Sequence, residues 1–384
     1  MKKLFYIGII GFCLFEILNV YFIMPMPWSQ QMNSIDIAYF LYLYRWFFRI
    51  VFGLLILIGS VSAFKSKHKW IPALVLLITI GIACLFNFKM NAESMFKQPE
   101  MLTFKSQENN VLNDSTVVIG VEYNGEAKAY PMRFLTYHHQ VQDVIGGKSV
   151  IVTYCSVCRT GRVFEPMVKG KHETFRLVGM DHFNAMFEDV TTKSWWRQAT
   201  GEAITGSLKG EALPEVESTQ LTIGTWFQLH PDAVVMQLDE ASKLSYDTLG
   251  RFEVGKSKGD LTRTDSLSWK DKSWVVGVQI GNASKAYDWN LLKQNQIIND
   301  KVGDHPILIA LSKDGQSFAA FERPSDLESF TVRNDTLFTA NKVFNFAGRS
   351  VNSTESLKKV SAYQEFWHSW RTFHPDTQKH NYSE

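Results

Sequence analysis

Three long apolar runs lie near the start of the chain, at residues 4–24, about 41–64 and 70–88. Each has about 18 residues or more, enough for a helix rising about 1.5 Å per residue to cross a hydrocarbon core about 30 Å thick. The first run ends in Met-Pro-Met-Pro-Trp without a small-x-small cleavage site, which favours a retained helix over a signal peptide. The pattern predicts three transmembrane helices.

Basic residues are unevenly distributed around these runs. Lys2 and Lys3 precede the first run, and loop 65–69 carries three more lysines, whereas loop 26–36 has no Lys or Arg. The positive-inside rule therefore predicts a cytoplasmic N-terminus and a multi-pass protein of the cell (inner, cytoplasmic) membrane. The remaining chain is then expected on the periplasmic or extracellular side.

Charged residues also occur within the apolar runs. Glu16 lies in the first run, and Arg45 and Arg49 lie one turn apart in the second. Ionisable groups at such positions are usually paired or functional. Glu16 and Arg49 fall at similar depth, so we expect Glu16 to pair with one of two outward-reaching arginines.

The part after the apolar runs contains an internal repeat. Residues 120–165 align without a gap on residues 277–322, and ten of the 46 positions are identical. A second match, between residues 213–232 and 357–376, includes a Trp-x-x-x-His-Pro-Asp motif in both places. Self-similarity of this kind indicates a duplicated structural unit.

The local pattern within the first copy is typical of strands with short helices. Asn124-Gly125 between two alternating runs predicts a β-hairpin. Residues 132–144 are predicted to form an amphipathic helix that ends at Gly146-Gly147. Further strands are expected at 149–154, from the following turn to 164, and at 174–178, 185–189 and 194–204.

These observations predict the fold class and the domains together. We expect three transmembrane α-helices followed by a mostly-β (α+β) soluble part built from two copies of one unit. The expected segments are the transmembrane segment at 1–90, the first repeat at 98–250 and the second repeat at 260–384.

One Cys-x-x-Cys pair, Cys155 and Cys158, follows a predicted buried strand, and His138 and His139 precede it. The pair has three physical interpretations: half of a metal site that needs further ligands, a thiol redox pair, or a structural disulfide that an external compartment permits. Cys13 and Cys84 lie in the apolar runs and are expected to be ordinary buried residues.

The second copy lacks all of these soft donor atoms. At the aligned positions, Ser312 and Gly315 replace the two cysteines, and Asn295 and Gln296 replace the two histidines. Thiols and imidazoles that disappear together are better explained by a site present in only one copy than by a lost disulfide. The comparison therefore favours a metal site in the first copy.

Two other groups of residues have weaker claims as ligands. The Trp-x-x-x-His-Pro-Asp motif of His230 recurs around His374, which is typical of a structural corner, although His230 lies in the copy that carries the cysteines. Met180, Asp181 and His182 form a further cluster of polar and soft side chains. Reduced copper accepts thiolate, imidazole and thioether ligands.

The runs YHHQVQDVIGGKSVIVTYCSVCRTGRVF, SWWRQATGEAITG and TWFQLHPD, in this order, resemble the bacterial domain of unknown function 3179. The resemblance places His138 at the family's histidine position and Cys155 and Cys158 at its cysteines. Since no activity is assigned to that family, the resemblance implies a fold and the position of a site but no reaction.

The chain departs from the family pattern at three positions. Ser156 stands where the family usually has Pro, Arg159 where it has Gly, and His139 where it has Glu.

Composition and motifs exclude several classes of function. Lys and Arg number 40 against 38 Asp and Glu, so no basic excess supports a nucleic-acid partner. The chain has no phosphate-binding loop of the Gly-Lys-Ser or Gly-Lys-Thr type and no Gly-x-Ser-x-Gly elbow, and no nucleotide cofactor is expected.

We therefore expect a membrane-anchored extracytoplasmic protein with a copper or zinc site that serves in metal handling or electron transfer. The expected ligands are Cys155, Cys158 and His138, with His139 or His230 as a fourth. Two alternatives remain: a thiol-disulfide oxidoreductase in which Cys155 attacks and Cys158 resolves, and a non-catalytic binding module with a structural disulfide. The membrane is the one expected partner; the sequence specifies neither a protein partner nor a small molecule.

Overall fold

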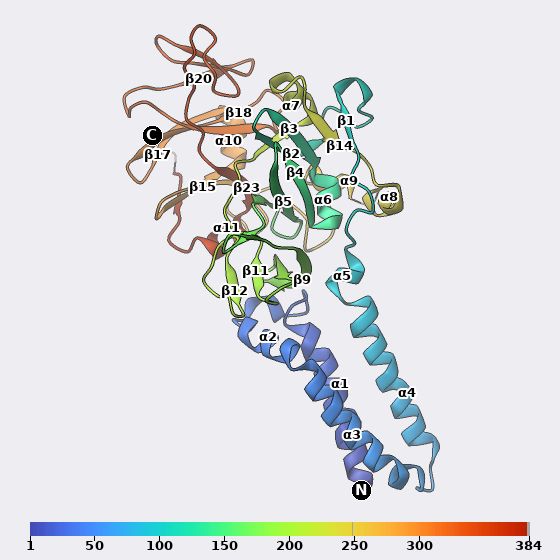
Figure 1. Ribbon diagram of the computed structural model, residues 1–384. Helices are drawn as coiled ribbons and strands as arrows, with labels where there is room; N and C mark the ends of the chain where they lie inside the picture. Colours follow the sequence, from blue (N-terminus) through green and yellow to red (C-terminus); the bar gives the residue numbers. More distant parts are fainter. Residues whose placement is uncertain (248, 382–384) are drawn as a thin grey trace. The chain divides into compact units, whose positions relative to one another are not determined.

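A computed structural model describes residues 1–247 and 249–381 of the chain (Figure 1). The chain divides into two compact units. The first unit contains residues 1–97, 173–197 and 202–212, and the second contains residues 98–172, 198–201 and 213–384.

Three helices of the first unit are long and apolar enough to cross a membrane: α1 (Lys2–Tyr21), α3 (Arg45–Phe64) and α4 (Trp70–Cys84), which continues as a π-helical turn over Leu85–Lys89. The three predicted helices are thus present. The second apolar run differs in detail, because its first residues belong to a separate helix, α2 (Ile35–Leu43), which is capped by Tyr44. This break places Arg45 at the start of α3.

The predicted pairing of Glu16 is confirmed. Arg49 Nε lies 2.7 Å from Glu16 Oε1, and the Glu16 side chain is 1% exposed. Asn87 of the π-helical turn donates a hydrogen bond of 2.8 Å to the other carboxylate oxygen. Three neighbouring helices thus contribute to one polar cluster, which satisfies the buried charge.

The first unit also contains an antiparallel sheet with the strand order β12-β11-β10-β9. Its strands are β9 (Phe175–Asp181), β10 (Asn184–Asp189), β11 (Trp195–Arg197) and β12 (Ala203–Thr205). The strand predicted over 194–204 is therefore two strands. The buried acids Glu188 and Asp189 accept hydrogen bonds from the indoles of Trp195 and Trp196, at 3.1 and 3.0 Å.

The second unit is mostly β, with short helices, and its first series of elements begins with a hairpin. The elements are β2 (Val117–Tyr123), β3 (Glu126–Pro131), α6 (Met132–His138), β4 (Gln140–Ile145), β5 (Lys148–Cys155), β6 (Thr160–Phe164), β13 (Thr219–Thr222), α7 (Ile223–Leu229) and β14 (Val234–Met236).

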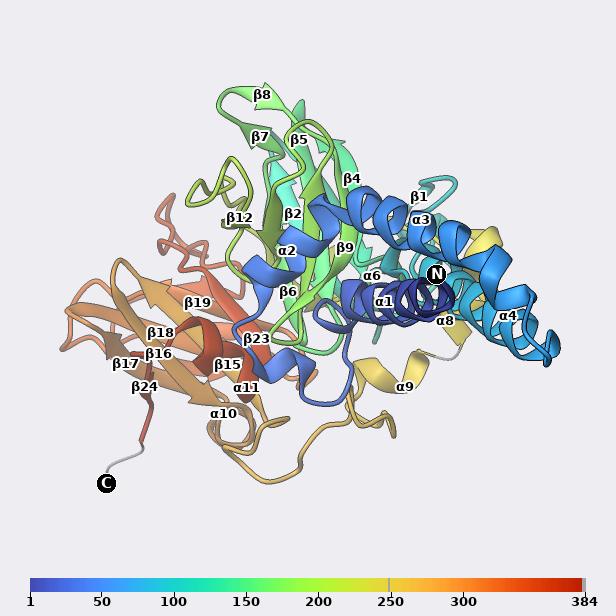
Figure 2. The ribbon, with the colours of Figure 1, turned by 90° about the horizontal axis from the view of Figure 1, so that it is seen from below.

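A second series has the same order of elements. It consists of β15 (Trp274–Ile280), β16 (Ala283–Asp288), α10 (Trp289–Asn295), β17 (Ile297–Val302), β18 (His305–Leu311), β19 (Phe318–Glu322), β23 (Ala362–Phe366), α11 (Trp367–Phe373) and β24 (Gln378–Lys379). Figure 2 shows β15 and β23 beside α11.

The pairing of strands is also the same in the two series. β2 lies antiparallel to β3 and β13, and β15 lies antiparallel to β16 and β23. β14 is parallel to β3, as β24 is to β16. The strands β4-β5-β6 and β17-β18-β19 form two further antiparallel sheets.

The remaining α-helices and strands are short. They are α5 (Ala92–Met95), β1 (Phe104–Ser106), β7 (Met167–Val168), β8 (Lys171–His172), α8 (Lys243–Asp247), α9 (Gly250–Glu253), β20 (Thr331–Arg333), β21 (Thr336–Phe338) and β22 (Val343–Asn345).

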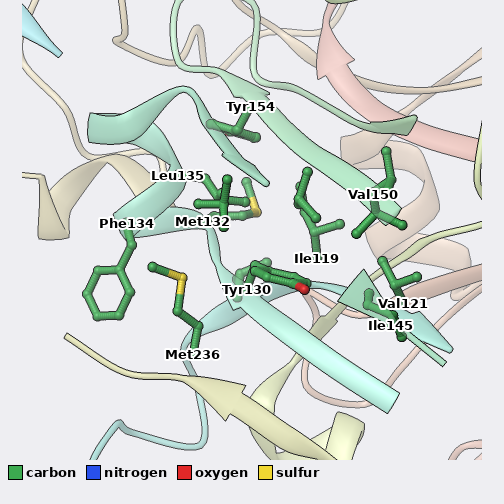
Figure 3. Close-up of a cluster of buried hydrophobic side chains, with 14 of the residues drawn as sticks. Ile119, Val121, Tyr130, Met132, Phe134, Leu135, Ile145, Val150, Tyr154 and Met236 are labelled. Atoms are coloured by element: carbon green, nitrogen blue, oxygen red, sulfur yellow. The ribbon is translucent and has the colours of Figure 1, made fainter. Parts of the chain in front are cut away.

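The first series encloses an apolar core, shown in Figure 3, in which Tyr130, Met132, Leu135 and Tyr154 are fully buried. The prediction of one helix over 132–144 is wrong in its second half. His139 takes a left-handed conformation (φ 62°) that ends α6, and the next six residues form β4 against β5. Gly146-Gly147, expected to stop a helix, forms the turn of the β4–β5 hairpin, with φ values of 54° and 82°.

Candidate functional site

The Cys-x-x-Cys pair lies at the turn of the β5–β6 hairpin. Cys155 is the last residue of β5 and pairs with Thr160 of β6. The turn closes through Arg159, whose φ of 57° is the left-handed conformation that favours glycine.

Both cysteines are buried because β5 is apolar and crosses the core. The side chain of Cys155 is 1% exposed and that of Cys158 is 0% exposed. Their sulfurs are within hydrogen-bonding reach of each other, and neither is in a disulfide. Burial, and then the neighbouring Cys155, raise the pKa of the Cys158 thiol well above its usual range.

Residues of the second series cover this turn. The hydroxyl of Ser369, on α11, lies within hydrogen-bonding reach of the Cys158 sulfur and 3.2 Å from the Thr160 hydroxyl. The backbone N–H of Phe366 donates to the Cys158 carbonyl at 2.9 Å. The site is therefore assembled from residues more than 200 positions apart in the sequence.

A half-buried lysine provides positive charge beside the two sulfurs. Lys272 Nζ donates to the Val157 carbonyl at 2.7 Å, and its charge acts on both Cys155 and Cys158. Burial lowers the pKa of Lys272, and the two thiols oppose that shift. An ammonium at this position stabilises any thiolate that forms.

The imidazole of His368 lies at the same edge of the turn. Its Nε2 atom is 3.2 Å from Lys272 Nζ and 3.2 Å from the Val157 carbonyl oxygen. Burial, and then the adjacent Lys272, lower the pKa of His368 to about 4, so the ring is neutral at pH 7. His368, Lys272 and Ser369 were not predicted as site residues, because all three lie more than 100 positions after the cysteines, in the part of the chain that contains no cysteine.

The two predicted histidines lie where α6 ends and β4 begins, and β4 pairs with β5. His138 Nε2 forms a short hydrogen bond with the Tyr246 hydroxyl. His139 Nδ1 lies 3.3 Å from the Tyr137 carbonyl oxygen, and its own carbonyl accepts from the N–H of Tyr154 at 3.0 Å. Burial lowers the pKa of His139 to about 4.

His230 lies on the opposite face of the β2–β3 sheet from the core that contains Tyr246. Its ring packs on Trp226 with the centroids 4.1 Å apart, and its Nδ1 atom is 3.6 Å from Glu122. Trp226 in turn packs on Gly120 of β2, whereas Ile119 and Val121 point into the core of the first series. His230 lines a partly open hollow together with Trp226 and Glu122.

The cluster around Asp181 forms an ion network in the first unit. Asp181 accepts from Arg197 and lies against His182, each at 2.7 Å. The Nε2 atom of His182 is 3.1 Å from the Asn33 side chain. Within residues 1–247 and 249–381, no group of three or more His, Cys, Asp or Glu side chains is arranged to hold one metal ion.

The fold and the site define a chain with three helices able to cross a membrane and a mostly-β part that carries a buried pair of thiols. A profile of the family described as protein of unknown function DUF3179 matches residues 95–377. The chain belongs to this family, as the order of its motifs indicated. No curated protein and no solved structure matches it.

Proposed function

We propose that Cys155 and Cys158 bind one Cu(I) ion, and that the protein handles this metal as a membrane-anchored extracytoplasmic protein. The observation that carries the proposal is the pair of buried, adjacent sulfurs beside the ammonium of Lys272. Thiolates are soft ligands that select Cu(I).

The donor count favours copper over zinc. A structural zinc ion commonly takes four ligands. Cu(I) is stable with two thiolates, which the turn supplies without His138, His139 or His230. Both thiols release their protons on binding, so that two RSH groups and one Cu⁺ give an (RS)₂Cu⁻ centre and two H⁺.

The charge of that centre supports the same assignment. The bis-thiolate centre carries one negative charge, and Lys272, whose Nζ is held by the Val157 and Leu261 carbonyls, supplies one positive charge in the buried site. A buried charge is tolerated only when it is paired. Lys272 is thus the counter-ion that this centre needs.

The second series supports a duplication in which the site is confined to one copy. Its turn carries Asp314 at the position aligned with Val157, and this carboxylate accepts hydrogen bonds from Thr222 at 2.9 Å and Thr225 at 3.0 Å. Thr225 aligns with Ser369, which touches Cys158. Each turn is therefore covered by the helix of the other series. The turn of the second series has a carboxylate–hydroxyl network at the place where the turn of the first series has the two sulfurs.

The extracytoplasmic placement rests on the distribution of lysines. Loop 65–69, between α3 and α4, carries three of them and is expected to face the cytoplasm. Labelling of single cysteines introduced at Ser66 and at Ser353, in otherwise cysteine-free protein in intact cells, tests this placement. An impermeant reagent should react only at Ser353; reaction at Ser66 alone would reverse the topology.

Anaerobic titration with Cu(I) against a chromophoric chelator tests the metal assignment on the full chain in detergent. We expect one equivalent bound by the wild type and by the Cys13→Ser/Cys84→Ser protein, which keeps the hairpin pair. The Cys155→Ser/Cys158→Ser protein should bind none. Equal binding by both double variants would reject the site.

The adjacent sulfurs also permit dithiol–disulfide exchange, in which two thiols lose two electrons and two protons to an external oxidant. Burial of both sulfurs works against access by a protein substrate. A reversible, measurable potential for the pair in a graded redox buffer, together with no Cu(I) binding, would favour this alternative. A disulfide that resists reduction would favour a structural role.

A further inference from the structure

A partly open hollow lies in the first unit, where the C-terminal ends of α1 and α4 meet the N-terminal end of α3. Its wall includes Asn19 and Val20 from the last turn of α1, Arg45 and Arg49 from the first turns of α3, and Asn87 after α4. Because these ends lie opposite the lysine-rich loop 65–69, the hollow falls near one boundary of the apolar region.

The polar wall of the hollow is rich in guanidinium groups. Arg45, Arg49 and, from β9, Arg176 all line it. Arg49 is neutralised by Glu16, and Arg176 lies 2.7 Å from Glu188 and 3.1 Å from Glu93.

Arg45 differs from the other two arginines. Among the described residues it has no carboxylate within ion-pair distance. Its guanidinium donates to the Tyr42 carbonyl at 2.6 Å and lies over the Tyr42 ring at 4.1 Å. A guanidinium has five N–H donors, so most of those of Arg45 remain available to a ligand. The hollow therefore has an uncompensated positive charge.

Most of the remaining lining is apolar, and these residues are called the apolar wall: Val20, Ile23, Met24, Phe86, Met90 and Val178. Asn19, which also lines the hollow, has a buried side-chain oxygen without a hydrogen-bond partner. Guanidinium, amide and hydrocarbon thus line one cavity, which suits a ligand with both an anionic head and an apolar tail.

We propose that this hollow binds the phosphate of an anionic phospholipid, with Arg45 as the main contact and the acyl chains along the apolar wall. Arginine binds phosphate oxygens through paired N–H donors. Basic pockets between transmembrane helices bind anionic lipid headgroups on this principle. The proposal is independent of the cysteine site.

Native mass spectrometry of the full chain, released from micelles that contain phosphatidylglycerol, tests the proposal. We expect wild-type protein to retain one tightly bound phosphatidylglycerol and to bind phosphatidylcholine more weakly. Arg45→Gln should weaken phosphatidylglycerol binding about tenfold, equivalent to about 1.4 kcal/mol, and Arg45→Lys should restore part of that loss.

Lys89→Gln is the matched control, because Lys89 lies at the same end of α4 but does not line the hollow. It should change the affinity less than twofold. Equal losses in Lys89→Gln and Arg45→Gln would indicate diffuse attraction and overturn the site. Competition with inorganic phosphate distinguishes a site for a lipid from a site for free phosphate. Full displacement of the lipid by millimolar phosphate would overturn the lipid assignment.

Unchanged binding by Arg45→Gln would also reject the proposal. The thermal midpoint of each variant without added lipid shows whether the protein is folded, and a variant with a lowered midpoint is replaced by Arg45→Met, which keeps the apolar stem. Weak lipid binding by a folded Arg45→Met protein supports the proposal.

Discussion

A buried ion pair joins the cysteine hairpin to β23, the strand that leads into the covering helix α11. Arg162, on β6, lies 2.5 Å from Glu365, at the end of β23, and the two side chains are 4% and 1% exposed. The second carboxylate oxygen of Glu365 accepts from Ser369, which touches Cys158. The change Glu365→Gln therefore removes one charge and weakens the support of the sulfur site.

The expected cost follows from burial. Removing one partner of a buried pair costs about 3–5 kcal/mol, because the other charge is left without compensation. Glu215 lies 3.7 Å from Arg162 but is 40% exposed, so it compensates only in part. We expect a loss of about 3 kcal/mol in the free energy of local opening around the hairpin.

The rate of thiol labelling measures this opening. In a Cys13→Ser/Cys84→Ser background only the two buried thiols react, and they react when the site opens. A loss of about 3 kcal/mol corresponds to labelling roughly 100-fold faster, since each 1.4 kcal/mol is a factor of ten, provided that the site recloses faster than the reagent reacts.

An exposed ion pair on the covering helix provides the control. Arg371 and Asp271 are 2.6 Å apart, but their side chains are 47% and 68% exposed. Such pairs contribute about 0–1 kcal/mol. Asp271→Asn should therefore change labelling less than about fivefold. The reasoning is refuted if Glu365→Gln and Asp271→Asn label at the same rate.

Three further predictions concern the mostly-β part, each measured as the unfolding of the full chain in detergent. His139 has a pKa of about 4 in the folded protein and 6.5 in the unfolded chain, so burial of the neutral ring contributes stability above pH 6.5. This contribution, at most about 3 kcal/mol, is lost as the pH falls toward 4. His139→Gln should remove this acid sensitivity, whereas His172→Gln, at an exposed position, should keep it. Gly277→Ala should lower stability by about 1–3 kcal/mol, because its Cβ would lie 2.1 Å from the Trp370 ring, and a stability equal to the wild type would contradict this packing. Arg159→Gly relieves the strain of the left-handed backbone but removes buried hydrogen bonds to three partners, so we expect the free energy of unfolding to fall by about 2 kcal/mol. A rise in the free energy of unfolding would show that the backbone effect dominates.

Much of the chain's local structure could be predicted from its sequence. The three apolar helices, the β2–β3 hairpin at Asn124-Gly125 and the strand that leads to Cys155 follow from hydrophobic length, turn residues and alternation. The contact between Glu16 and Arg49 also follows from the depth of each residue along its helix. These properties depend on neighbours within a few residues, on the length of an apolar helix, or on the depth of a residue along that helix.

The helix predicted over 132–144 shows where local pattern fails. Five of those residues pair with β5 instead, because His139 takes a left-handed conformation and the two glycines make a hairpin turn. Helical and strand periodicity differ little over so short a segment, and the pairing partner decides between them.

The cysteine turn could be located from sequence, but its surroundings could not. Spacing alone identifies Cys155 and Cys158 and predicts a tight turn after a buried strand. Ser369 and Lys272 reach the sulfurs only because the hairpin of one series packs against a helix of the other, a contact between residues more than 100 positions apart. Local sequence does not predict packing between such distant residues. The burial of the two thiols and the positive charge beside them, which together set their pKa values, were therefore decided by the tertiary structure.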